Sequence, residues 1–149
     1  MKRREFLFTA FSAAVLAAPV RAATAQMQVL KSPTCGCCGA WVAHIEDAGF
    51  VVDVQDVPQD VLWAAKDRAG ITAELSSCHT GLIEGYVIEG HVPAADIQRL
   101  LAERPDAIGL TVPGMPIGSP GMEMGDQRDA FDTLLVLRDS NTVVFSSHT

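Results

Sequence analysis

Three of the four cysteines lie in one motif, Cys35-Gly36-Cys37-Cys38, and the fourth is Cys78. The motif falls between Gln28–Lys31, a short apolar run predicted to be a strand, and Cys38–Ala48, which has the apolar stripe of a helix. A helix N-terminus offers free N–H groups and the positive end of the helix dipole, and both stabilise thiolates. The sequence therefore predicts a sulfur-rich site where a strand leads into the first helix.

The next elements continue this alternation of strand and helix. Val51–Val57 has the pattern of a strand, and Pro58–Ala69 has the pattern of a second helix. Leu82–Val92 has the β-branched and aromatic character of one or two strands, and Pro93–Glu103 is predicted to be a third helix with proline in its first turn. This order predicts the α/β class and, within it, a thioredoxin-like fold.

Residues 109–126 match neither pattern, since they contain five Gly, three Pro and three Met. Loops longer than about 12 to 15 residues are uncommon and usually functional or disordered, and the apolar content argues against disorder. We expect a long Gly/Pro/Met-rich insertion loop here. Within it, Thr111-Val112-Pro113 resembles the loop whose proline is cis in glutaredoxin-like proteins. The chain then ends with two predicted strands, Thr133–Arg138 and Thr142–Ser146, joined as a hairpin.

Residues 1–25 have the pattern of an export signal. A basic start at Lys2–Arg4 precedes a 12-residue apolar or small-residue run, Leu7–Ala18, which is followed by further small residues. That run is shorter than the roughly 20 residues of a membrane-spanning helix. Arg3–Leu7 also resembles the twin-arginine motif. We expect a cleaved signal peptide, a periplasmic location without membrane insertion, and a single domain over residues 26–149.

Composition narrows the class of protein further. A chain of 149 residues fits one domain, and its 48% hydrophobic and 19% charged residues can form a core, which excludes disorder. The formal net charge of −7 gives no basic surface for phosphate contacts. We therefore expect no nucleic-acid partner.

The four cysteines allow three interpretations. In an oxidising compartment they could form two disulfides, although the neighbours Cys37 and Cys38 could pair with each other only in a strained ring. Cys35 and Cys38 have the C-x-x-C spacing of a thiol–disulfide oxidoreductase, but the additional thiol of Cys37 would trap mixed products. The four sulfurs could also form a compact anionic cluster that requires metal cations. The spacing leaves all three open.

Among metals, copper fits the other donors in the chain best, because structural zinc and ferredoxin-type iron use different cysteine spacings. His79 is a candidate because it adjoins Cys78, and His44 because it lies on the same helix face as Cys37. Of the remaining histidines, His91 is interpreted as a cap at a strand end, and His148 lies one residue from the C-terminus. The loop methionines are Met115, Met122 and Met124, of which the first two are the chosen candidates.

Several blocks resemble one known family. They are Cys35-Gly36-Cys37-Cys38, Ser77-Cys78-His79-Thr80, Glu84–Pro93, Val112–Pro116 and Gly118–Glu123. Together they resemble the periplasmic copper-resistance proteins called CopG, long described as a domain of unknown function. The resemblance implies a thioredoxin-like fold that carries a multinuclear copper cluster with a role in copper redox chemistry during detoxification. It also implies that the bridging thiolates are Cys35, Cys37, Cys38 and Cys78.

The sequence thus predicts an exported copper-binding protein of copper resistance and homeostasis that holds more than one Cu(I) ion. A copper-dependent oxidoreductase is the enzyme class left open, with no catalytic residue assigned. The expected partners are copper ions and other periplasmic copper-handling proteins. The alternative is a periplasmic thiol–disulfide oxidoreductase that uses Cys35 and Cys38.

Overall fold

The computed structural model describes residues 26–149, so the expected export signal lies outside the described residues. The strands are β1 (Gln26–Lys31), β2 (Val51–Asp56), β3 (His79–Ile83), β4 (Tyr86–Gly90), β5 (Gly109–Val112), β6 (Phe131–Val136) and β7 (Thr142–His148). The helices are α1 (Gly36–Asp47), α2 (Gln59–Arg68), α3 (Ala94–Glu103) and the short 3₁₀ helix η1 (Ala73–Leu75). Within these residues, none of the helices is long and apolar enough to cross a membrane. The fold is mixed α/β, as predicted.

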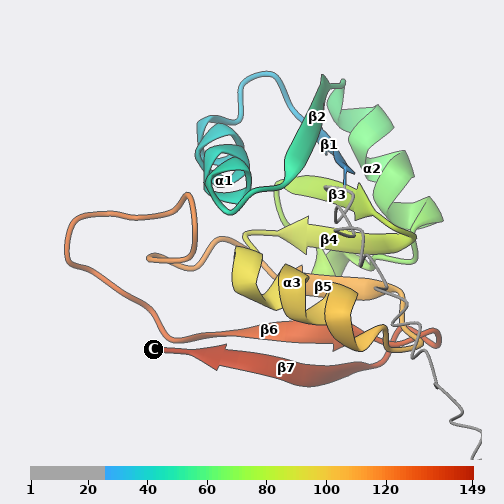
Figure 1. The fold of residues 1–149 in the computed structure, drawn as a ribbon. Coiled ribbons are helices and arrows are strands. Elements are labelled where there is room, and N and C mark those ends of the chain that lie inside the picture. The colour runs from blue at the N-terminus through green and yellow to red at the C-terminus, as the bar shows by residue number, and fades with distance from the viewer. Residues whose placement is uncertain (1–25) are drawn as a thin grey trace, which may run out of the picture.

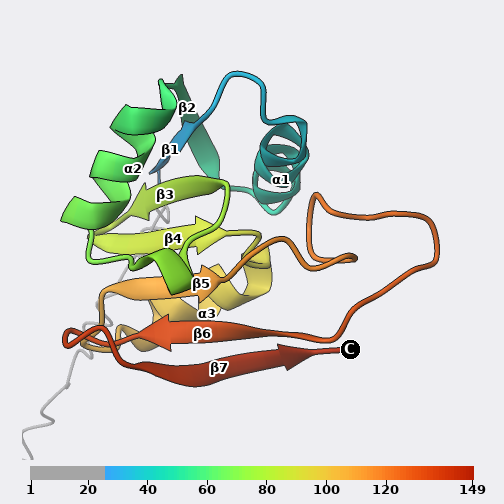
Figure 2. The same cartoon turned by 180° about the vertical axis from the view of Figure 1, so that it is seen from behind.

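All strands join one sheet in the order β2-β1-β3-β4-β5-β6-β7 (Figure 1). The pairs β1–β2 and β4–β5 are parallel, and the others are antiparallel. Helices α1 and α3 lie over one face, whereas α2 and η1 lie over the other, as the two opposite views show (Figures 1 and 2). Because β1 and β3 are antiparallel, with Lys31 opposite His79, the end of β1 that leads into α1 lies beside the start of β3 at one end of the sheet.

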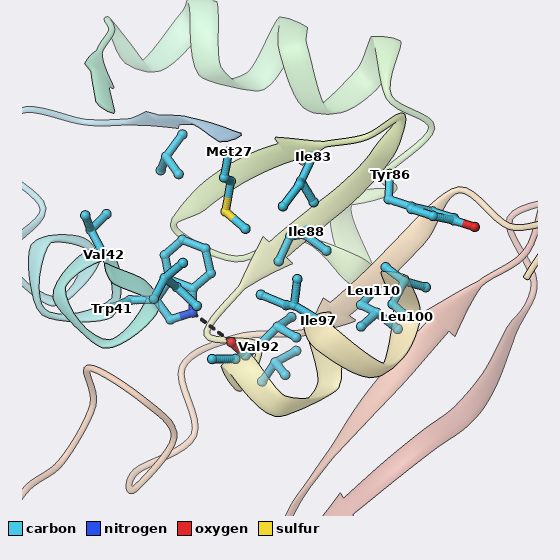
Figure 3. Packing of buried hydrophobic residues seen from close by; sticks show 14 of the residues in the cluster. Met27, Trp41, Val42, Ile83, Tyr86, Ile88, Val92, Ile97, Leu100 and Leu110 are labelled. Carbon is cyan, nitrogen blue, oxygen red and sulfur yellow. Dashed lines mark hydrogen bonds between the residues drawn. The ribbon is translucent and has the colours of Figure 1, made fainter. Parts of the chain in front are cut away.

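The main core fills the space between the sheet and the pair α1 and α3. Trp41, Ile88 and Ile97 are fully buried there, and the Trp41 Nε1–H donates to the carbonyl of Val92 at 2.9 Å (Figure 3). Side chains alternate along a strand, so Val87 faces the opposite side and packs in a smaller cluster. Burying Trp41 in this core fixes α1, and with it the cysteine motif, against the sheet.

The expectation of a loop over residues 109–126 is wrong at its start. Gly109–Val112 forms β5, and all four of its residues are buried. A short apolar run bounded by turn residues is typical of a fully buried strand, and the surrounding Gly and Pro residues obscured it. The expected likeness to a cis-proline loop is also corrected, because no peptide bond within residues 26–149 is cis.

The irregular segment 113–130 connects β5 to β6 and packs against α1. Gly121 has a φ of +85°, and a Cβ added there would lie 2.6 Å from the Trp41 nitrogen and 2.8 Å from the Cys37 carbonyl oxygen. Only glycine permits such a close approach in this backbone conformation. Both views show this segment leaving the C-terminal end of β5 and running beside α1 (Figures 1 and 2). The segment therefore borders the cysteine motif.

Candidate metal centre

The fold brings the four cysteines together. Cys35 is the N-cap of α1, Cys37 and Cys38 lie in its first turn, and Cys78 precedes β3. The four Sγ atoms all lie within 4.8 Å of one another. The Cys37 Sγ is 3.6 Å from the Cys35 Sγ and 3.8 Å from the Cys78 Sγ. The predicted sulfur cluster is therefore a single compact group at the start of α1.

Two of these sulfurs are oxidised. Cys35 and Cys38 form a disulfide, whereas Cys37 and Cys78 are free thiols. Cys35 is partly exposed and Cys38 is fully buried. In this state the site offers two thiols, and the other two become available when the disulfide accepts two electrons.

His79 lies next to the cluster on the core side of the sheet. Its Nδ1 is 3.6 Å from the Cys78 Sγ, and its ring packs 4.2 Å from the Trp41 ring, centroid to centroid. The Nε2 atom is buried and has no hydrogen-bond partner. Burial lowers the pKa of His79 well below its usual value, and the neighbouring His91 and Lys66 lower it further, although the Gly90 backbone opposes this. The ring is therefore neutral, with a nitrogen that nothing in the described protein satisfies.

His91 lies beside Cys78 in a group that could hold a metal ion, although the sequence indicated only a cap at a strand end. Its Nδ1–H donates to the carbonyl of Pro120 at 2.8 Å, because a carbonyl can only accept. The lone pair is then on Nε2, which lies 3.1 Å from the Cys78 Sγ. Burial lowers the pKa of His91, although the Pro120 hydrogen bond and Glu123 oppose this. A ring whose second nitrogen is hydrogen-bonded to a backbone carbonyl is oriented as metal-bound histidines are.

Cys78 connects the two sets of donors. Its sulfur belongs to the cysteine group and also to a second group with His79 and His91. Burial, followed by the nearby Cys37, raises the pKa of Cys78 to about 11. Without a metal this thiol keeps its proton at neutral pH and donates it toward the His91 Nε2. A bound cation would displace that proton, as metal binding to thiols requires.

The other sequence candidates lie elsewhere. The His44 Nε2 accepts the Ala94 N–H at 3.1 Å and so caps the start of α3, outside both donor groups. Met115 is 53% exposed and Met122 is partly buried, both in the segment that borders α1. Their role as ligands stays a prediction. The Nε2 of His148, on β7, lies 2.9 Å from the Oδ2 of Asp96.

A cleft of about 480 Å³ opens elsewhere and is lined by residues that include Trp63, Asp67 and Thr72. No cysteine or histidine lines it. Among the described residues, the groups that could hold a metal ion therefore lie at the sulfur cluster and not in this cleft.

Fold and site define an α/β protein with a cysteine-rich candidate metal centre. Residues 75–122 match the family described as "Protein of unknown function, DUF411". A solved structure named "Copper resistance protein copG", Form 2, is 43% identical, with 85% of this chain and 100% of that chain covered and a TM-score of 0.79. Form 1 is 44% identical, with 83% and 96% covered and a TM-score of 0.77. The chain belongs to the CopG family of copper resistance proteins. No curated protein matches it.

Proposed function

We propose that this protein binds copper in copper resistance and holds more than one Cu(I) ion on Cys35, Cys37, Cys38 and Cys78. The observation that carries the proposal is the approach of all four sulfurs to within 4.8 Å. The closest free pair, Cys37 and Cys78, is 3.8 Å apart, less than twice a metal–thiolate bond of roughly 2.3 Å. One ion can therefore bond to two sulfurs, and a sulfur can bridge two ions. Thiolates are soft ligands that select Cu(I).

The nitrogen donors of this site are His91 and His79. Both are neutral in the metal-free protein, and neutral imidazole is the form that binds metals. The buried Nε2 of His79 has no hydrogen-bond partner, and a bound metal or one of its ligands would supply one. Met115 and Met122 are further proposed donors from the segment beside α1, and His44 is the remaining candidate on α1.

We also propose that the fold is thioredoxin-like and that the protein is exported to the periplasm. Support for the fold is the order β1-α1-β2-α2-β3-β4-α3 around a parallel β1–β2 pair and an antiparallel β3–β4 pair. Support for export is the signal pattern in residues 1–25. In that compartment the protein would receive copper ions directly or from other copper-handling proteins.

Full copper loading requires reduction of the Cys35–Cys38 disulfide. A dithiol reductant supplies two electrons and two protons, opens the S–S bond and leaves as a disulfide. Cu(I) then displaces the thiol protons. Bound copper would supply one-electron redox chemistry, which is the basis of the proposed oxidoreductase activity.

Copper stoichiometry tests the proposal. Anaerobically reduced mature protein is titrated with Cu(I) against a competing chelator, and more than one ion per chain is expected. Protein that retains the Cys35–Cys38 disulfide should load fewer ions, since two sulfurs are withheld. His148→Asn, away from the site, serves as the matched histidine control. A ratio of one or below, or equal preference for Zn²⁺, would contradict the cluster.

One observation favours a second function, thiol–disulfide exchange. The Cys35–Cys38 disulfide lies at a helix N-terminus, with Cys35 partly exposed and Cys38 buried. An attacking thiolate can therefore reach Cys35, and Cys38 becomes the leaving group. The exchange rate with a small dithiol, measured on metal-free protein, tests this function.

A further inference from the structure

A buried ion pair lies on the sheet face opposite Trp41 and His79. The Lys66 Nζ on α2 is 2.5 Å from the Glu89 Oε1 on β4, and their side chains are 4% and 0% exposed. Thr80 accepts a hydrogen bond from the Lys66 Nζ at 2.9 Å and donates to the Glu89 Oε2 at 2.7 Å. Both charges are thus removed from water and paired inside the fold.

Stability alone does not account for this pair. Removing two charges from water has a large desolvation cost, and apolar pairs of similar volume are often as stable or more stable. The metal-binding proposal does not use Lys66 or Glu89 as ligands. We therefore looked to the other hydrogen bonds of the Glu89 carboxylate for its role.

One of these hydrogen bonds is with the backbone next to Cys78. The Ser77 N–H donates to the Glu89 Oε1 at 2.6 Å. Hydrogen bonds to an ionised acceptor are stronger than those between neutral groups. Glu89 therefore holds the residue that immediately precedes a cysteine of the cluster.

Further contacts hold Ser76 and Ser77, the two residues before Cys78, in place. The Ser77 hydroxyl donates to the Gly114 carbonyl at 2.5 Å, and the Gly114 N–H donates to the Ser76 carbonyl at 3.2 Å. Gly90 lies under Ser77, where an added Cβ would be 2.5 Å from the Ser77 Cβ. The backbone before Cys78 is thus held by Glu89 on β4 and by Gly114 after β5.

We propose that Glu89, held by Lys66, is a positioning residue that keeps the Cys78 sulfur beside the other cysteines through the Ser77 N–H. The importance of this placement for copper rests on the proposed function. The placement itself can be measured without copper, because the Cys78 Sγ lies 3.8 Å from the free thiol of Cys37.

The test uses metal-free protein with the Cys35–Cys38 disulfide intact. Diamide takes two electrons and two protons from a thiol pair, forms an S–S bond and becomes the hydrazine. Peptide mass analysis follows the rate at which disulfides that include Cys78 appear. This rate reports how close the Cys78 sulfur lies to the sulfurs of the other cysteines.

Two double variants isolate the hydrogen bond. Lys66→Met with Glu89→Leu removes both charges and the acceptor, whereas Lys66→Met with Glu89→Gln removes the charges but keeps an acceptor for the Ser77 N–H. The Leu variant should form these disulfides about tenfold more slowly, because the Ser77 N–H loses its acceptor. Its unfolding midpoint should be kept or raised, because apolar side chains replace the buried ion pair. The Gln variant should stay near the wild-type rate. Equal rates in all three folded proteins would overturn the proposal.

Ser77→Pro covers the case in which the Leu variant does not fold. It removes the N–H but leaves the ion pair in place, and the ψ of 149° at Ser76 suits a residue before proline. Ser77→Ala is its control, because proline also removes the hydroxyl. Slowing in the proline variant beyond that in the alanine variant is expected, and no such slowing would refute the role of Glu89.

Copper titration of the same proteins separates the two proposals. The Leu variant should lose Cu(I) stoichiometry while the Gln variant keeps it. If wild-type protein itself fails to load copper but the disulfide rates differ as expected, the copper proposal falls and the positioning role stands.

Discussion

The Nε2 of His91 lies 3.1 Å from the Sγ of Cys78, and the opposite nitrogen of the same ring is hydrogen-bonded to the Pro120 carbonyl. The carbonyl fixes which nitrogen carries the proton, so the lone pair faces the sulfur. The pair thus places an oriented nitrogen lone pair beside a sulfur, in a group that could hold a metal ion.

Loss of this oriented ring should weaken copper binding. His91→Asn is expected to lower Cu(I) affinity by at least about tenfold, a loss of the size seen when the groups around a metal are disturbed. The measurement is a chelator competition on reduced protein, with His148→Asn as the control. Equal affinities in wild type and His91→Asn would show that His91 is not a ligand.

Cys37→Ser separates the copper function from the exchange function. If all four sulfurs hold copper, this variant should lose stoichiometry as severely as Cys35→Ser, because a three-coordinate Cu(I) loses a soft ligand. An exchange enzyme uses only Cys35 and Cys38, so the same variant should keep its exchange rate or improve it. Both are measured on one preparation. Full copper loading with retained exchange would favour the oxidoreductase.

The thiol of Cys78 should react slowly with iodoacetamide in metal-free protein. Because its pKa is about 11, its thiolate fraction at pH 8 is roughly one in a thousand, and its alkylation rate should rise about tenfold per pH unit up to that pKa. Peptide mass analysis follows Cys78 alone, and the urea-unfolded chain gives the reference for an ordinary thiol. A rate that levels off near pH 8.5 would be inconsistent with the buried environment.

The neutral ring of His79 should make the metal-free protein less stable in acid. Its pKa in the folded state lies well below 6.5, so below about pH 6.5 the unfolded chain binds a proton that the folded protein does not. The free energy of unfolding then falls by about 1.4 kcal/mol per pH unit for this group. Urea unfolding of His79→Phe between pH 7.5 and 5 should show a flatter dependence than wild type. Parallel curves would rule out this contribution.

Gly121 should tolerate no side chain. Gly121→Ala places a Cβ 2.6 Å from the Trp41 nitrogen in a backbone with φ of +85°, so a loss of about 1 to 3 kcal/mol in unfolding free energy is expected. Gly125→Ala is the matched control, since its φ is also positive but its added Cβ has open space. Thermal unfolding of the two variants compares them directly. Similar losses in both would mean that the close approach to α1 is unimportant.

Local patterns predicted most elements because each carries its own signals. Pro93 and the apolar spacing after it predicted α3 to within one residue at its start. The same local signals failed for β5, where a buried strand of four residues is bounded by Gly and Pro-rich chain. The class α/β followed from the order of the elements.

His91 could have been found from the turn between β3 and β4. Glu84 and Gly85 both have positive φ, as a two-residue type I′ hairpin requires. That turn sets the register, in which Thr80 pairs with Glu89, and two residues further out Cys78 falls opposite His91. The contacts of Pro120 with His91 and of Glu89 with Ser77 had no such signal, because they depend on how distant segments pack.

The close approach of Gly121 to α1 means that the Pro120 carbonyl, which orients His91, is in place only once residues 113–130 have packed against α1. A newly made chain that ends soon after Cys38 offers three thiols to any soft ion, without Cys78, His91 or the carbonyl that orients it. Contacts between residues so distant in sequence require closure of the long stretch of chain between them. A chain must therefore extend beyond Pro120, and fold that far, before it presents the oriented set of proposed donors to a metal.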